Sequence, residues 1–400
     1  MSEKQPAGLK GRSLLVFIVY YIAYSSIYVA RSNFSIASAL LESMGVLSIT
    51  QIGLIGGIFS AVYAVMKIPS GYIGDRVPVR LIMGAGLTVT ALSNLLIGFF
   101  PTFWSIAILW GMNACGQSVL WGPMLRAINE HYGPERGKVL CQRVITSCTI
   151  GSMVGTLLAG RCSTALGAAA CFLIPGAIVL AVAIMVWVML GKHSVSRQKE
   201  EKKVQPMSFG ALLRDKNFQG MTLPAFLYGV VRNNVSGWMA IYYMDKFGID
   251  LAAVSFFVFV MPAFSFVSQS YFPRVCRLVG NEYRTSILGF GVVALSMLPM
   301  ALGIVNPITA FICMGVGTMA YAMHGSHFVS LFPAQYANVG SVSLVASLTD
   351  SLCYVGSAVG SLLAGVLIEG WGYGTMYAVM AALSVAGMLA LILIYKNRKA

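Results

Sequence analysis

Two arginines could bind an anion, because each lies deep inside an apolar stretch of the sequence. Arg31 and Arg232 are separated by 201 residues, half of the 400-residue chain. A guanidinium group can donate two parallel hydrogen bonds to one oxyanion. Two such groups facing each other would bind a tetrahedral dianion such as a phosphate group. The alternative is that both pair with buried acids, and only Asp350 lies well inside an apolar stretch.

Two more cations, Lys67 and Arg143, also interrupt apolar segments. A charge at the centre of a membrane helix costs about 2.5–3.5 kcal/mol on insertion scales, so these groups should face a polar cavity. Both lie only a few residues from a helix end, so snorkelling toward the interface stays open for them. Four cations and one acid predict a cavity with about three excess positive charges.

Asp350 has three possible roles. It could pair with Arg143, accept a proton, or hold the amine of a zwitterionic phosphate or phosphonate. His324 and His327 lack the neighbours that a metal site needs, so packing or hydrogen bonding to the backbone is favoured for them over proton coupling.

Tyrosines stand at helical spacing from these charges. Tyr24, Tyr28 and Arg31 are spaced four and three residues apart, which places them on one helix face. A phenol offers both a donor and an aromatic wall to a polar ligand. The same spacing of four residues links four further pairs: Tyr63 with Lys67, Arg143 with Ser147, Tyr228 with Arg232, and Asp350 with Tyr354.

The elements that position these residues are membrane-spanning helices. The chain is 58% hydrophobic and 10% charged, whereas soluble domains carry about 25% charged residues. Apolar segments of about 20 residues can cross the roughly 30 Å of a bilayer core, and the chain contains segments of this kind. We predict an all-α membrane protein with twelve spans, at 14–41, 48–70, 80–100, 104–127, 138–159, 165–191, 219–243, 249–271, 285–303, 306–330, 339–367 and 372–395.

The basic residues predict topology and domains. Both termini and the loops on their side hold 21 of the 27 Lys and Arg residues. This bias predicts that both termini lie on the cytoplasmic side of the cell (inner) membrane. The net charge of +14 therefore needs no nucleic acid to explain it. A polar stretch, 192–217, predicts a cytoplasmic linker between two pseudo-symmetric six-helix bundles, 1–191 and 218–400, with a ligand site between them near the midplane.

The turn after the second span resembles the loop signature of the major facilitator superfamily, in which charged residues latch helix ends. The signature rests on Gly71, Asp75, Arg76 and Arg80. Four longer segments resemble the organophosphate:phosphate antiporter family: YIAYSSIYVARSNFSIA (21–37), YAVMKIPSGYIGDR (63–76), WGPMLRAINEHYGPERG (121–137) and YGVVRNNVSGW (228–238).

This resemblance implies a phosphate clamp made by Arg31 and Arg232, with Trp121 lining the pathway. Around the clamp it places Tyr24, Tyr28, Tyr63, Lys67 and Tyr354. The fifth span departs from the glycerol-3-phosphate branch of the family, because Arg143 and Ser147 stand where that branch has a tryptophan and a histidine. The residues expected to hold phosphate are therefore retained, whereas the residues of the fifth span expected to select the substrate differ.

Together these features predict an alternating-access transporter, without cofactor or enzymatic activity. We expect a monomer in the lipid bilayer that exchanges phosphorylated or phosphonylated organic anions for inorganic phosphate. Symport of the anion with a proton is the alternative form of coupling. A facilitator for carboxylates and a transporter-like sugar-phosphate sensor are the competing hypotheses. The sequence has no phosphate-binding loop of the GxxxxGK[ST] type, which argues against ATP drive.

Overall fold

The computed structural model describes residues 11–74, 77–190, 207–336 and 342–397, and these ranges contain helices and no strand. The first half of the chain forms α1 (Gly11–Ser43), α2 (Ile49–Gly74), α3 (Val79–Phe99), α4 (Phe103–Ser118), α5 (Trp121–Tyr132), α6 (Pro134–Val144), α7 (Thr146–Leu166) and α8 (Ala170–Met189). The second half forms α9 (Phe209–Arg214), α10 (Lys216–Arg232), α11 (Met239–Phe247), α12 (Leu251–Val279), α13 (Glu282–Ala301), α14 (Pro307–Gly325), the π-helix η2 (Ser326–Leu331), α15 (Phe332–Ala334) and α16 (Val342–Asn397).

Nine helices in the described chain are long and apolar enough to cross a membrane. The longest, α16, holds two of the predicted spans, because Gly372 breaks it with a φ of 83°. The fourth predicted span is divided between α4 and α5 and the seventh between α10 and α11, and these pieces are too short to be counted singly. The twelve predicted crossings are therefore all present, and the predicted fold is confirmed.

Asparagine and aspartate side chains cap the N-termini of several of these helices. Asp250 accepts a hydrogen bond from the backbone N–H of Ala253 at 2.9 Å and so caps α12. Asn306 and Thr309 form a reciprocal capping box at the start of α14. Such caps satisfy the first N–H groups of a helix, which have no partner within it.

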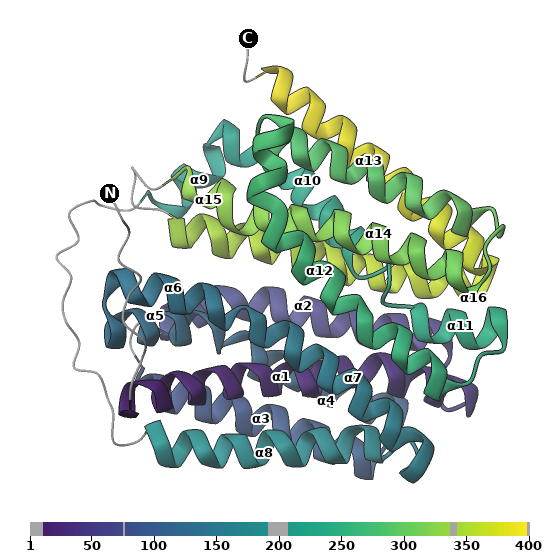
Figure 1. Ribbon diagram of the computed structural model, residues 1–400, viewed down its shortest axis with the longest axis horizontal. Helices are drawn as coiled ribbons and strands as arrows, with labels where there is room; N and C mark the ends of the chain where they lie inside the picture. The colour runs from purple at the N-terminus through teal and green to yellow at the C-terminus, as the bar shows by residue number, and fades with distance from the viewer. Residues whose placement is uncertain (1–10, 75–76, 191–206, 337–341, 398–400) are drawn as a thin grey trace.

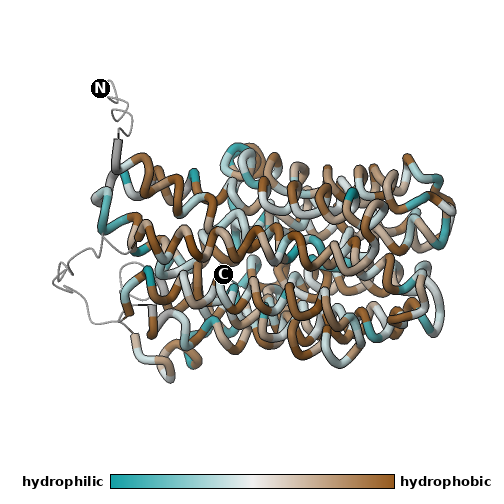
Figure 2. The backbone as a smooth tube through the Cα atoms, turned by 90° about the horizontal axis from the view of Figure 1, so that it is seen from below, coloured by the Kyte–Doolittle hydropathy of each residue, from teal (hydrophilic) through white to brown (hydrophobic). Residues whose placement is uncertain are grey.

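The two halves of the chain form two groups of helices that lie against each other. In Figure 1, α1 to α8 occupy the lower part of the molecule and α10 to α16 the upper part. Hydrophilic residues gather at both ends of the bundle, and apolar residues dominate between them (Figure 2). We call the end where α2 finishes the near end and the end where α2 begins the far end. The predicted linker, 192–217, falls largely outside the described residues, and its described last part contains α9 and the start of α10.

The halves are in close contact at the far end. The backbone N–H of Thr50, in the first turn of α2, donates to Oε2 of Glu369 on α16 at 2.7 Å. One turn further along α2, a Cβ atom at Gly53 would lie 2.6 Å from the carbonyl oxygen of Ser361, so only glycine allows this approach. Helix α7 also packs against α12 across the same boundary. Toward the near end the ribbons of the two halves separate (Figure 1).

Helix α10 packs closely on α16 through Gly229, which gives a test of the fold. A Cβ atom there would overlap the carbonyl oxygen of Cys353, whereas one at Gly220 on the same helix would meet only Ile394 at 3.7 Å. We expect Gly229→Ala to lower the free energy of unfolding by about 1–3 kcal/mol, because the backbone of α16 must shift. Gly220→Ala should be neutral or stabilising.

Thermal unfolding of the purified protein in detergent would measure both variants. Equal melting temperatures for Gly229→Ala and Gly220→Ala would contradict the packing of α10 on α16.

Candidate functional site

Arg31 follows a kink in α1. Ala30 has φ −88° and ψ 18°, outside the helical range. Amide side chains from α4 bind carbonyl groups at the kink, since Asn113 donates to the carbonyl of Ala30 at 3.1 Å and Gln117 donates to that of Ile27 at 3.2 Å. Inside a bilayer such carbonyls have no water to bind, so the amides make the kink stable.

The same amide cluster fixes α1 to its neighbours beyond the kink. Asn33 donates to Oδ1 of Asn94 on α3 at 3.0 Å and to the carbonyl of Cys171 on α8 at 2.9 Å. Gln117 donates to Oδ1 of Asn113 at 2.9 Å. This amide cluster was not predicted from the sequence. Asn and Gln residues inside apolar segments could have indicated it, because their amide groups need hydrogen-bond partners within a membrane span.

Arg232 is the last residue of α10 and also lies at a helix break. Residues 233–238 are not helical, and α11 resumes at Met239. Asn234 donates to the carbonyl of Val230 at 2.7 Å, and Trp238 donates its indole N–H to Oδ1 of Asn234 at 2.9 Å. Broken helices at mid-depth are typical of ligand sites in transporters.

The two arginines have equivalent surroundings. Asn33 stands two residues after Arg31 and Asn234 two residues after Arg232, so the asparagines share the separation of the arginines. Both asparagines are fully buried, but Asn33 bonds to α3 and α8, whereas Asn234 bonds within its own segment to Val230 and Trp238. Each half thus presents one arginine at a helix irregularity that amide groups stabilise.

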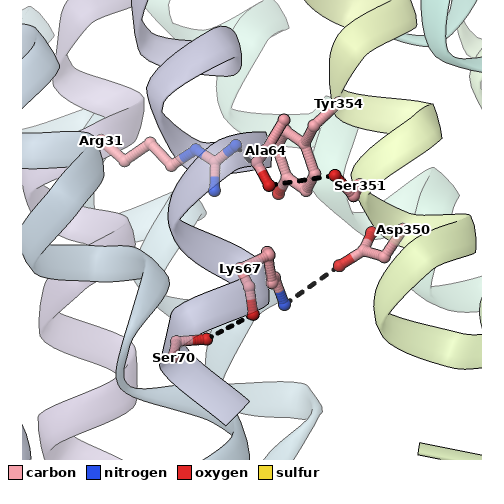
Figure 3. Close-up of polar contacts among 7 residues, drawn as sticks. All are labelled: Arg31, Ala64, Lys67, Ser70, Asp350, Ser351 and Tyr354. Atoms are coloured by element: carbon pink, nitrogen blue, oxygen red, sulfur yellow. Dashed lines mark hydrogen bonds and ion pairs between the residues drawn. The ribbon is translucent and has the colours of Figure 1, made fainter. Parts of the chain in front are cut away.

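The structure brings both guanidinium groups to the same tyrosine. Their Cζ atoms lie 5.8 Å (Arg31) and 4.3 Å (Arg232) from the ring centroid of Tyr354 on α16. Arg31 also donates from Nη2 to the hydroxyl of Tyr354 at 3.3 Å, and the two side chains are shown in Figure 3. The guanidinium of Arg31 lies over the rings of Phe59 (4.7 Å) and Tyr63 (5.3 Å) as well. Aromatic faces stabilise a desolvated cation without neutralising it.

A salt bridge joins the halves next to these arginines. Lys67 Nζ on α2 lies 3.0 Å from Oδ2 of Asp350 on α16 (Figure 3). One residue along α16, the Ser351 hydroxyl donates to the carbonyl of Ala64 at 3.0 Å. Tyr63 stacks on Tyr354 with a centroid distance of 4.2 Å. Charge pairing, a hydrogen bond and ring stacking therefore connect α2 and α16 at mid-depth.

Arg143 is not the partner of Asp350, so that predicted pairing is wrong. Ile145, between α6 and α7, keeps helical φ and ψ values of −59° and −33°, and Arg143 lies exposed in the last turn of α6. Ser147 is buried in α7, where its hydroxyl donates to the carbonyl of Val144 at 2.5 Å. Both residues were expected at the site, and the described contacts of Lys67 and Asp350 include neither.

An aromatic wall extends from Arg31 along α1 toward the near end. Tyr28 lies 5.8 Å from the Arg31 guanidinium, and its ring contacts that of Tyr24 at 5.6 Å. Trp121, at the start of α5, packs on Tyr24 with a centroid distance of 4.8 Å. The predicted tyrosine stripe is therefore continuous, and Trp121 is part of it.

Tyr228 forms the corresponding contact in the second half. Its ring centroid is 5.7 Å from the Arg232 guanidinium and 5.7 Å from the His324 ring behind it. The ring nitrogens of His324 lie 3.1 Å from the carbonyl oxygen of Ser286 and 3.3 Å from that of Tyr321. This is the backbone hydrogen bonding that the sequence favoured for His324. His327 lies one turn further along the chain, with Nδ1 2.8 Å from the hydroxyl of Ser286.

The loop signature after α2 is only partly described. Asp75 and Arg76 lie outside the described residues, as does the environment of Gly71. The Arg80 guanidinium lies 5.7 Å from the centre of the Trp187 ring on α8. Nearby, Arg126 on α5 donates to the carbonyl of Val77 at 3.3 Å.

The charges at mid-depth leave two positive charges uncompensated. Asp350 pairs with Lys67, and the described contacts of Arg31 and Arg232 are with aromatic rings and a phenol hydroxyl. Arg143 is exposed on α6 and makes no described contact with these groups, so Arg31, Arg232 and the Lys67–Asp350 pair together carry an excess of two, not three. An oxyanion between the guanidinium groups would supply the charge and the acceptors that they lack. No group of three or more His, Cys, Asp or Glu residues in the described ranges could hold a metal ion.

Comparison with known proteins agrees with this architecture. The Membrane sensor protein UhpC of Salmonella typhimurium is 24% identical over 95% of this chain and 90% of its own length. A Probable hexose phosphate transport protein of Chlamydia trachomatis is 21% identical over 94% and 89%. The crystal structure of the nucleoside transporter NupG superposes with a TM-score of 0.76 at 12% identity, covering 95% of this chain and 99% of that one.

The sequence profile of the Major Facilitator Superfamily matches residues 14–354, most of the chain. Since the family profile, the relatives and the twelve-helix fold all agree, the chain belongs to the Major Facilitator Superfamily and is a multi-pass membrane transporter similar to the organophosphate:phosphate antiporters, not an enzyme.

Proposed function

We propose that this transporter carries small phosphorylated or phosphonylated organic anions in exchange for inorganic phosphate. The observation that carries the proposal is the pair of guanidinium groups, one from each half, that lie on the ring of Tyr354. Two forked donors with a net charge of two match a phosphate monoester dianion in charge and in hydrogen-bond geometry. Relatives named for hexose phosphate transport support the same substrate class.

The exchange follows from electrostatics. In the empty site the two guanidinium groups repel each other and lack acceptors, which opposes the closing of the halves around them. A bound dianion cancels this charge and joins the halves through hydrogen bonds. The loaded carrier therefore changes state more easily than the empty one, and transport in one direction requires a return load. Inorganic phosphate fits as that load because it presents the same oxygen atoms.

The conformation fits one state of an alternating-access cycle. The halves meet at the far end through Thr50 and Glu369 and separate toward the near end (Figure 1). We propose that the near end faces the cytoplasm, because the excess of Lys and Arg on that side favours this orientation in an inner membrane. The state is then inward-facing. We propose that a single monomer in the lipid bilayer completes the cycle, because each half supplies one arginine of the clamp.

The first test concerns the forked geometry. Arg31→Lys and Arg232→Lys should each reduce phosphate exchange in proteoliposomes at least tenfold, because an ammonium group cannot form two parallel hydrogen bonds to one phosphate. Arg161→Lys, at an exposed position on α7, is the matched control and should keep wild-type exchange. Near-normal exchange in either clamp variant, at equal amounts of inserted protein, would remove the clamp from the mechanism.

The second test concerns the charge balance. Asp350→Asn raises the net charge of the site from two to three, so it should favour phosphate esters that also carry a carboxylate over simple dianionic esters. A change of about tenfold in their uptake ratio corresponds to about 1.4 kcal/mol. The double variant Lys67→Gln/Asp350→Asn restores the net charge of two and should restore the original ratio. An unchanged ratio in Asp350→Asn would show that the Lys67–Asp350 pair is purely structural.

The third test separates the competing functions. Millimolar inorganic phosphate should inhibit uptake of the organic anion, because both bind the same guanidinium groups. A carboxylate facilitator would ignore phosphate. A sugar-phosphate sensor would bind the ligand, seen as a thermal shift, with little flux into proteoliposomes. Similarity to the sensor UhpC makes the flux measurement necessary.

A further inference from the structure

A separate cavity lies beyond Arg31, on the far side of the clamp. Its volume is about 240 Å³, and both halves of the chain line it. This is somewhat below the roughly 300–1,000 Å³ typical of pockets for drug-sized ligands, so it fits a small group. We call it the upper chamber, where upper means toward the far end of the bundle and not the upper part of Figure 1. The residues that define it are Arg31, Phe34, Ser60, Trp110, Asn233 and Ser361.

Rigid aromatic groups form one wall of the upper chamber. Trp110 stacks on Phe34 with a centroid distance of 4.7 Å and contacts Phe59 at 5.6 Å. On the opposite half, Trp238 also lines the chamber and is fixed by the hydrogen bond of its indole N–H to Asn234. Contacts within the protein fix these rings, so a ligand would meet a preformed surface.

Polar groups from both halves face the same space. Ser60 on α2, Asn233 in the break after α10 and Ser361 on α16 line the chamber, the two serines buried and Asn233 partly buried. Their side chains make no hydrogen bond to another described residue. Asn234, by contrast, uses its amide for Val230 and Trp238. A hydroxyl or amide group that is largely removed from water is stabilised when a ligand supplies the missing hydrogen bond.

The upper chamber is neutral apart from Arg31 at its border. Its described lining contains serine, asparagine, glycine, apolar and aromatic residues, with no acid and no second cation. A carboxylate or an amine placed there would lack a partner of opposite charge and would be costly to desolvate. An uncharged hydroxylated group would find donors, acceptors and aromatic faces instead.

We propose that the upper chamber binds the uncharged, hydroxylated part of the substrate, a polyol or sugar, while the phosphate group is held by Arg31 and Arg232. This inference rests on the proposed function and narrows its substrate class. It assigns Ser60, Asn233 and Ser361 as specificity-determining residues, contributed by both halves. Inorganic phosphate needs the clamp alone.

The test compares glucose 6-phosphate with inorganic phosphate as external substrates for proteoliposomes loaded with inorganic phosphate. Ser60→Leu fills the chamber and should lower the ratio of glucose 6-phosphate uptake to phosphate uptake at least tenfold. The matched control is Ala61→Leu, which adds the same side chain at the next, exposed position of α2 and should leave the ratio unchanged. Asn233→Ala removes a hydrogen-bonding amide without adding bulk and should lower the ratio severalfold.

The outcomes distinguish this inference from the proposed function. A wild-type protein that exchanges neither substrate overturns the proposed function and the inference with it. Wild-type exchange combined with an unchanged ratio in Ser60→Leu overturns the upper chamber alone, as does an equal loss of both uptakes in that variant. If Ser60→Leu is not inserted, the ratio in Asn233→Ala decides: a selective loss of glucose 6-phosphate supports the chamber, and no change overturns it.

Discussion

A guanidinium group at mid-depth in a membrane protein has to be stabilised by the protein, because the hydrocarbon offers it neither water nor counter-ions. In this chain the stabilisation comes from aromatic faces, with Arg31 lying over Phe59 and Tyr63 and both arginines sharing Tyr354. Aromatic faces lower the cost of burial and leave the charge in place. The nearby carboxylate is already bound by a lysine, so the affinity of the site for an external anion is retained.

The positions of the two arginines depend on irregular helices. A kink precedes Arg31 and a break of six residues follows Arg232, and buried amides bind carbonyl groups at both places. An unbroken helix would satisfy its own backbone and would leave Asn113 and Asn234 without these acceptors. The amides and the irregular backbone therefore stabilise each other. This mutual dependence fixes the position of each arginine in its own half of the chain.

Much of this arrangement could be predicted from the sequence, since a charge inside an apolar segment is conspicuous and the separation of Arg31 and Arg232 indicates duplicated halves. The partner of Asp350 could not be predicted, because it depends on which faces of α2 and α16 meet across the boundary. Arg143 was expected at the site because it interrupts an apolar segment, and in the structure its side chain is exposed on α6 and does not reach Asp350. Which way a side chain points depends on how its helix packs, and hydropathy does not reveal that.

The contact between Thr50 and Glu369 has a consequence for the speed of the cycle. It is a hydrogen bond from a helix N-terminus to an exposed carboxylate, at the end of the bundle where water has access. If the halves separate there, water forms hydrogen bonds with the Thr50 N–H and the Glu369 carboxylate. Breaking the bond therefore requires little net free energy. In the proposed cycle this hydrogen bond would therefore add little to the barrier for opening, and the helix packing at Gly53 and between α7 and α12 would set most of it.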